Sequence, residues 1–105
     1  MTKYHQKEIE NITKQIVKKY KPEKIILYGS FAYGKPTEDS DVDLLVIKKT
    51  NKRKVERIQE LLMKIKSNLP LEPLVYSPKE YEERLDLGDF FFQDIFKKGK
   101  VLYEK

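Results

Sequence analysis

The chain has 105 residues, of which 39% are hydrophobic and 37% are charged, and its formal net charge at pH 7 is +5. This length predicts one domain, residues 1–105, and the apolar residues fall in periodic blocks, which excludes a disordered chain. The absence of cysteine excludes disulfides and thiolate metal sites. No signal peptide or membrane-spanning run is visible, so we expect a cytoplasmic protein without a membrane partner.

The first half of the chain predicts one long helix, two strands and a short helical turn. Ile9, Ile12, Ile16 and Tyr20 recur at helical spacing, so the first twenty residues are expected to form an amphipathic helix that ends at Lys21-Pro22. After it we expect a buried strand at residues 25–28, a Gly-Ser turn, a helical turn at residues 31–33, a polar loop at residues 37–40 and a second strand at residues 42–48.

The second half predicts three helices and two strands. The apolar face of the first of these helices is expected to consist of Val55, Ile58, Leu61, Leu62 and Ile65. A third strand is expected at residues 71–76, and Ser77-Pro78 with Glu80 then predicts a helix start. That helix is expected to stop near Gly88, and Asp89 to cap a last helix that carries Phe92, Ile95 and Phe96. Residues 101–103 are expected to form a short strand or an extended tail.

This order of elements, α-β-(short α)-β-α-β-α-α-β, predicts one layered α/β or α+β domain. The lysines are scattered over helix faces and turns, so a solvated surface explains the positive charge better than nucleic-acid binding does. The three consecutive aromatics at residues 90–92 cannot all face inward on one helix. An exposed one among them would mark a partner-binding patch.

The stretch from Gly29 to Asp43 carries the chemistry. Successive side chains of a strand alternate between faces, so Asp41 and Asp43 should project from one side, about 6.5–7 Å apart along the backbone. Glycine at position 29 allows the backbone to approach a phosphate closely, and Ser30 adds a hydroxyl beside helix N-terminal amides. Two carboxylates beside such a turn suit a Mg²⁺-bound nucleoside triphosphate.

A two-ion arrangement at this site would serve both sides of an in-line displacement at the α-phosphate. One Mg²⁺ would activate the attacking hydroxyl, and the other would neutralise the leaving pyrophosphate. A third carboxylate on a neighbouring strand would complete the shell of the first ion, and Glu72, which opens the third strand, is the candidate.

The pattern Gly29-Ser30, ten residues, then Asp41-Val42-Asp43 resembles the minimal nucleotidyltransferase domain of the DNA polymerase beta-like superfamily. The chain is similar, more narrowly, to small stand-alone proteins that pair with HEPN-domain partners as toxin–antitoxin systems. The resemblance also covers the leading helix, the junction at residues 75–78 and the closing Gly-Lys-Val-Leu-Tyr from Gly99. It implies a small mixed, partly antiparallel sheet flanked by helices.

The resemblance also implies site roles. Gly29 and Ser30 would hold the triphosphate, and Asp41, Asp43 and Glu72 would bind the metals. Many relatives have Asp at the position of Glu72, and here Pro73 follows it, so the strand is expected to be bulged or to lie at a sheet edge. Many relatives also carry Arg near position 33, where this chain has tyrosine, so Lys35 is expected to meet the phosphate charge instead.

The expected function is Mg²⁺-dependent transfer of a nucleoside monophosphate, AMP from ATP, to a hydroxyl. By resemblance, the acceptor is a tyrosine of a HEPN-type toxin, and this protein is the antitoxin, in a homo- or hetero-oligomer. One alternative is transfer to a small molecule such as an aminoglycoside, which the short chain disfavours. Another is a non-catalytic module that neutralises its partner by contact. Direct nucleic-acid binding would show itself by strongly salt-dependent affinity.

Overall fold

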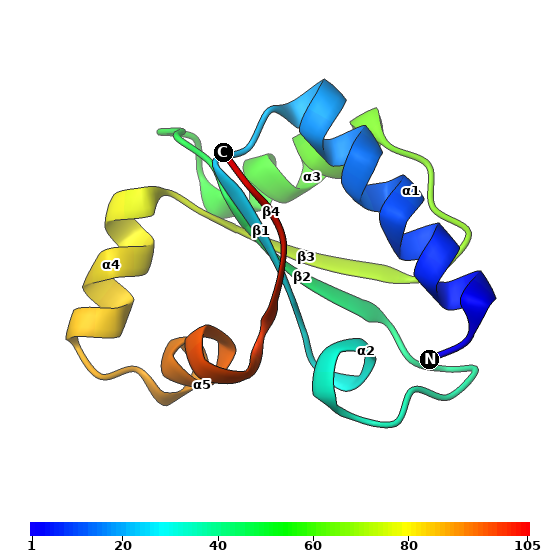
Figure 1. The fold of residues 1–105 in the computed structure, drawn as a ribbon. Helices are drawn as coiled ribbons and strands as arrows, with labels where there is room; N and C mark the ends of the chain where they lie inside the picture. The colour runs from blue at the N-terminus through cyan, green and yellow to red at the C-terminus, as the bar shows by residue number, and fades with distance from the viewer.

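The structure, a computed structural model that describes residues 1–105, is a four-stranded sheet with helices on both faces (Figure 1). The helices are α1 (Lys3–Tyr20), α2 (Ser30–Tyr33), α3 (Lys54–Lys64), α4 (Pro78–Asp86) and α5 (Phe90–Lys98). The strands are β1 (Lys24–Tyr28), β2 (Val42–Ile47), β3 (Leu71–Tyr76) and β4 (Lys100–Glu104). No helix has the length and apolar character needed to cross a membrane.

The strand order is β3-β2-β1-β4. The β1–β2 and β1–β4 pairs are antiparallel, whereas β2 and β3 are parallel. The predicted mixed, partly antiparallel sheet flanked by helices is therefore confirmed. Strand β3 lies at an edge and pairs with β2 without interruption, so Pro73 is accommodated at an edge, where its missing N–H interrupts no second ladder.

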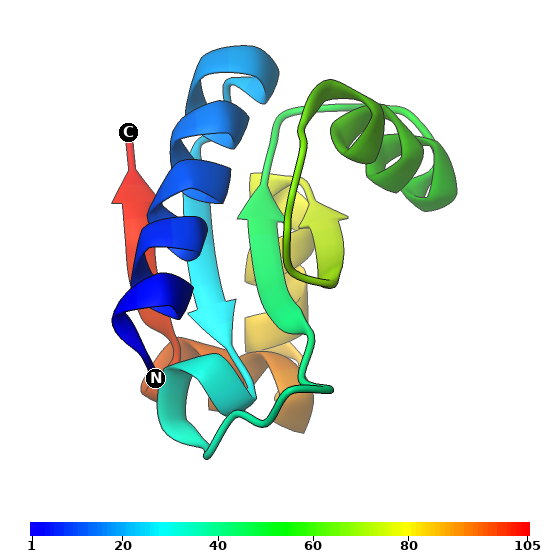
Figure 2. The same cartoon turned by 90° about the vertical axis from the view of Figure 1, so that its right-hand side faces the viewer.

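The two faces of the sheet bury separate clusters of side chains. Helices α1 and α3 cover one face (Figure 2), where Ile12, Ile16, Leu27, Leu44 and Leu61 are buried together. The opposite face is covered by α4 and α5, where Ile26, Leu45, Tyr81, Phe92 and Ile95 are buried together. Neighbouring residues of β1 and β2 enter opposite clusters because strand side chains alternate. At the end of the sheet where β1 ends and β2 and β3 begin, the paired residues are polar: Tyr28, Asp43 and Glu72.

The predicted helix starts at Ser77 and Asp89 are confirmed by their hydrogen bonds. The Ser77 amide donates to the Glu80 carboxylate at 2.7 Å, and the Glu80 amide donates to the Ser77 hydroxyl at 3.2 Å. The Asp89 carboxylate accepts from the amides of Phe91 and Phe92 at 3.0 and 3.3 Å. The Ser77–Glu80 bonds are reciprocal, the Asp89 carboxylate accepts both of its bonds, and all four satisfy amides at a helix start that have no partner within the helix.

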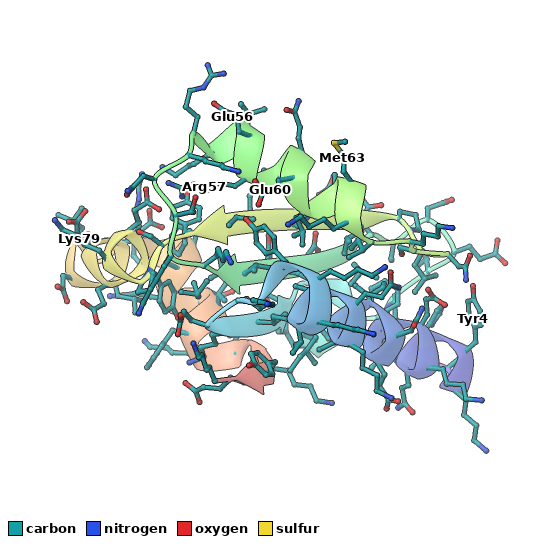
Figure 3. The ribbon with its side chains drawn as sticks, turned by 90° about the horizontal axis from the view of Figure 1, so that it is seen from above. Tyr4, Glu56, Arg57, Glu60, Met63 and Lys79 are labelled. Atoms are coloured by element: carbon teal, nitrogen blue, oxygen red, sulfur yellow. The ribbon has the colours of Figure 1, made fainter.

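Three side chains predicted to lie on apolar helix faces are exposed instead. Val55 and Leu62 on α3 are 55% and 42% exposed, and Phe96 on α5 is 62% exposed. Within helix α3 only Arg57 and Leu61 are buried, and Met63 points away from the sheet (Figure 3). Helical periodicity identified an apolar face correctly but overestimated its width.

Candidate active site

Gly29 adopts a backbone conformation that brings the chain into contact with Asp43. Its φ of 75° lies in the left-handed region, and helix α2 begins at the next residue. A Cβ atom added at this position would lie 2.2 Å from Asp43 Oδ2. Glycine is therefore required here by the position of the Asp43 carboxylate as well as by the backbone conformation.

Three side chains form a row across the sheet at this end. Tyr28 pairs with Asp43 in the antiparallel β1–β2 ladder, and Asp43 pairs with Glu72 in the parallel β2–β3 ladder. Paired residues of neighbouring strands project from the same face, and adjacent strands are about 4.8 Å apart. The structure thus places Glu72 beside Asp43, on the neighbouring strand where the sequence predicted a third carboxylate.

Asp41 is held by a tight turn that precedes β2. The Thr37 amide donates to the Ser40 hydroxyl at 2.8 Å, and the Ser40 amide donates to the Thr37 carbonyl at 3.1 Å. The residue after Asp41 is fixed as well, because the Val42 amide donates to the carbonyl of Pro70, just before β3, at 2.7 Å. The backbone on both sides of Asp41 is therefore fixed by hydrogen bonds, in the Thr37–Ser40 turn before it and at Val42 after it.

The carboxylates influence one another electrostatically. Burial raises the pKa of Asp43, and the charges of Glu72 and Asp41 raise it further. Burial also raises the pKa of Tyr28, with additional contributions from Asp43 and Glu72. Negative charge is thus concentrated at one end of the sheet, where a bound cation would relieve the repulsion.

The donor set fits Mg²⁺ chemically, since hard cations prefer carboxylate oxygens. No group of three or more acidic or histidine side chains is arranged to hold a metal ion in the structure, however. Glu72 is exposed, while Asp41 and Asp43 are half-buried. Asp41, Asp43 and Glu72 are the residues that would hold the ion, with Asp43 and Glu72 paired on adjacent strands.

Ser30 and Lys35, the predicted phosphate-binding side chains, lie in and just after α2. Ser30 is the first residue of α2, and no side-chain hydrogen bond caps this helix. Lys35 is exposed in the segment between α2 and the Thr37–Ser40 turn. No ion pair fixes Lys35 against the carboxylates, so its predicted contact with phosphate stays a prediction.

The sequence pattern did not indicate Tyr28 or Asp94 as residues of this site, nor the contacts that Phe91 and Tyr33 make there. Tyr28 was assigned only to a buried strand, although the alternation of β1 places its side chain on the face of Asp43. Phe91 packs edge-on against the Tyr28 ring, with centroids 5.5 Å apart. The Tyr33 hydroxyl lies 3.5 Å from Asp94 Oδ2, a contact between residues 61 positions apart. No local pattern signals contacts of such long sequence separation.

The structure brings a strand–Gly-Ser–helix turn beside paired aspartates on a mixed sheet, as expected for a nucleotidyltransferase. The chain belongs to the polymerase beta nucleotidyltransferase family, whose family model matches residues 10–105. It is similar to a protein of Methanocaldococcus jannaschii named "Putative protein adenylyltransferase MJ0604", with 28% identity over 102 residues, 93% of this chain and 97% of the relative.

A second protein of the same organism, named "Putative protein adenylyltransferase MJ1379", is 51% identical over 41 residues, which are 38% of this chain and 41% of the relative. No solved structure matches the chain. The family assignment therefore rests on the match that covers nearly the whole chain, and it confirms the family that the Gly-Ser and Asp-x-Asp pattern predicted.

Proposed function

We propose that this protein transfers AMP from ATP to a hydroxyl of another protein. The observation that carries the proposal is the position of Glu72 beside Asp43, in register on adjacent strands, with Gly29 against the Asp43 carboxylate. Membership of a nucleotidyltransferase family supports nucleotidyl transfer. The names of the two relatives support AMP as the transferred group and a protein as the acceptor.

In this proposal Asp41, Asp43 and Glu72 hold Mg²⁺. When bound, Mg²⁺ supplies charge neutralisation at the phosphate oxygens and activation of the attacking hydroxyl. Ser30 and Lys35 bind the triphosphate, and Gly29 keeps the backbone close enough to reach it. The acceptor oxygen forms a bond to the α-phosphorus while the bond to the β-phosphate oxygen breaks, so pyrophosphate leaves and the hydroxyl proton is released.

The acceptor that we propose is a tyrosine of a small helical HEPN-type toxin, which this protein would silence as its antitoxin in a complex. This part of the proposal depends on the resemblance of the whole chain to stand-alone minimal nucleotidyltransferases. A HEPN-type protein encoded next to this chain's gene is the acceptor to test.

The test is incubation of the two proteins with ATP and Mg²⁺, followed by intact-mass spectrometry of the partner. We expect the partner's mass to rise by one or more AMP units, and both Asp41→Asn and Asp43→Asn to reduce the rate by at least about a hundredfold. Asp39→Asn is the matched control, because Asp39 is an exposed acid of the preceding turn. A rate lost equally in the control would contradict the assigned roles.

A contact-only antitoxin is the second candidate, and the absence of a preformed metal-ligand set favours it. In that case the two proteins would form a tight complex without any change in the partner's mass. Equilibrium dialysis of ATP with Mg²⁺ separates the candidates further, since the transferase must bind the nucleotide and a contact-only module need not.

A further inference from the structure

Aromatic side chains are exposed at the end of the sheet that carries the carboxylates. Phe90 is 89% exposed, and Phe91 and Tyr33 are each 46% exposed. We call these three residues the aromatic surface. They come from the start of α5 and from α2, which lie at the same end of the sheet (Figures 1 and 2).

Two residues of the aromatic surface, Phe91 and Tyr33, contact residues next to the carboxylates. The Phe91 ring packs edge-on against Tyr28, at 5.5 Å between centroids and an interplanar angle of 90°. Tyr28 in turn pairs with Asp43 across the sheet. On the other side the Tyr33 hydroxyl reaches Asp94 of α5 at 3.5 Å. A molecule that rests on Phe91 and Tyr33 is therefore close to Asp43 and Asp94, and Phe90 precedes Phe91 on the same helix.

The exposure of Phe90 is imposed by the packing of its helix. Phe92 and Ile95 occupy the core beneath α5, and a residue two positions before Phe92 lies on the opposite side of a helix. The Asp89 cap fixes the first turn through its bonds to the Phe91 and Phe92 amides. Phe90 is thus held outward on an ordered turn, where its 89% exposed ring buries little apolar area in the folded chain.

The carboxylates lie on an open part of the surface. None of the five hollows on the surface is lined by Asp41, Asp43 or Glu72. A protein acceptor can bring its own surface to such an open site, and the names of the two relatives support a protein as the acceptor.

The side chains around the aromatic surface favour a protein segment over a nucleic acid. The rings lie near Asp43 and Asp94, and Lys98 of α5 is paired with Asp94 at 3.3 Å. Nucleic-acid binding needs several free cationic groups against the phosphates, and stacking on aromatic rings accompanies such groups. Exposed rings beside acids suit a protein segment with apolar and basic side chains.

We propose that the aromatic surface, and Phe90 above all, docks the segment of a partner protein that presents the acceptor hydroxyl between apolar and basic side chains. This inference depends on the proposed function, because it names the surface that would bring the acceptor to the site. Phe90 is a docking residue here and takes no part in nucleotide binding.

The test compares Phe90→Ala with Phe96→Ala, which removes the same ring from an exposed position of the same helix. The affinity of each variant for the HEPN-type acceptor is measured by calorimetry, and the KM values for acceptor and ATP are measured by AMP incorporation. We expect Phe90→Ala to raise both the acceptor Kd and its KM by about tenfold or more. The KM for ATP should not change, and Phe96→Ala should behave as the wild type.

Several outcomes would overturn the inference. These are equal effects of the two substitutions, a raised KM for ATP, or no complex between the wild type and the acceptor. Binding that depends on Phe90 but involves a single-stranded oligonucleotide, or a second copy of this chain in sedimentation, would also overturn it. A complex that Phe90→Ala weakens, but that shows no AMP transfer, supports the docking surface and contradicts only the proposed function.

Discussion

Gly29 is required both by its positive φ and by the Asp43 carboxylate beside it. Gly88 shares the positive φ but has no such neighbour, so a comparison of the two glycines distinguishes the two requirements. Gly29 and Gly88 both have a φ of 75°, but a Cβ at Gly88 would meet no atom within 4 Å, whereas a Cβ at Gly29 would collide with Asp43. Gly88→Ala should therefore cost only the backbone strain, about 1 kcal/mol. Gly29→Ala should cost at least this strain, because a φ of 75° with a ψ of −155° is open essentially only to glycine, and should also displace the Asp43 carboxylate.

Thermal unfolding and dialysis against ATP with Mg²⁺ measure the two effects. We expect both alanine variants to unfold at lower temperature, and only Gly29→Ala to lose nucleotide binding. If Gly88→Ala lost binding to the same extent, the steric role of Gly29 toward Asp43 would be wrong.

At the scale of elements, local signals predicted what local physics determines. The Ser77 and Asp89 starts and the β3 span at residues 71–76 follow from side-chain caps and from a bounded apolar run, and the structure has them where they were expected. Local signals did not predict how many residues of each apolar helix face are buried. Val55 and Phe96 match the helical period but find no partner, because the packing of whole helices decides which flank is covered.

The junction of α3, β3 and α4 depends on one ion pair, and this makes stability sensitive to acid. Arg57 is 5% exposed and donates to Glu80 Oε1 at 2.7 Å and to the Val75 carbonyl at 3.2 Å; Figure 3 labels it on α3. The Arg57 guanidinium lowers the pKa of Glu80 from its usual 4.5 to about 2. A lowered pKa means that ionised Glu80 stabilises the fold above the unfolded-state value and loses this contribution as the pH falls toward 2.

Glu80→Gln should therefore destabilise the protein at neutral pH, by at most about 3 kcal/mol. The difference from the wild type should shrink as the pH falls from about 5 toward about 3. Urea unfolding over this range provides the measurement, with Glu82→Gln as the control because Glu82 is exposed on the same helix. A difference between Glu80→Gln and wild type that is independent of pH would show that the charge of Glu80 contributes nothing.

At the scale of the whole molecule, the candidate site is assembled from segments that the sequence keeps apart. The Gly-Ser and Asp-x-Asp pattern identified Gly29, Asp41 and Asp43, because their spacing is local. The proximity of Glu72 depends on the parallel pairing of β2 with β3, and that of Tyr33 to Asp94 on the placement of α5. Strand order and helix placement are set by burial across the entire chain, so residue spacing alone did not reveal Tyr28, Phe91 or Asp94.

The pairing of these strands places the carboxylates of Asp41, Asp43 and Glu72 close together. A ligand that neutralises their charge should therefore raise the free energy of unfolding of the whole protein. Asp43 has a raised pKa because burial and the carboxylates of Glu72 and Asp41 disfavour its charge. Asp43→Asn removes this repulsion and should unfold at a higher temperature than the wild type in EDTA.

Mg²⁺ with a non-hydrolysable ATP analogue should stabilise the wild type, by about 2.7 kcal/mol at a hundred times the Kd. The variant should gain almost nothing, and NaCl at matched ionic strength controls for screening. Equal stabilisation of wild type and variant would place the ligand somewhere other than beside Asp43.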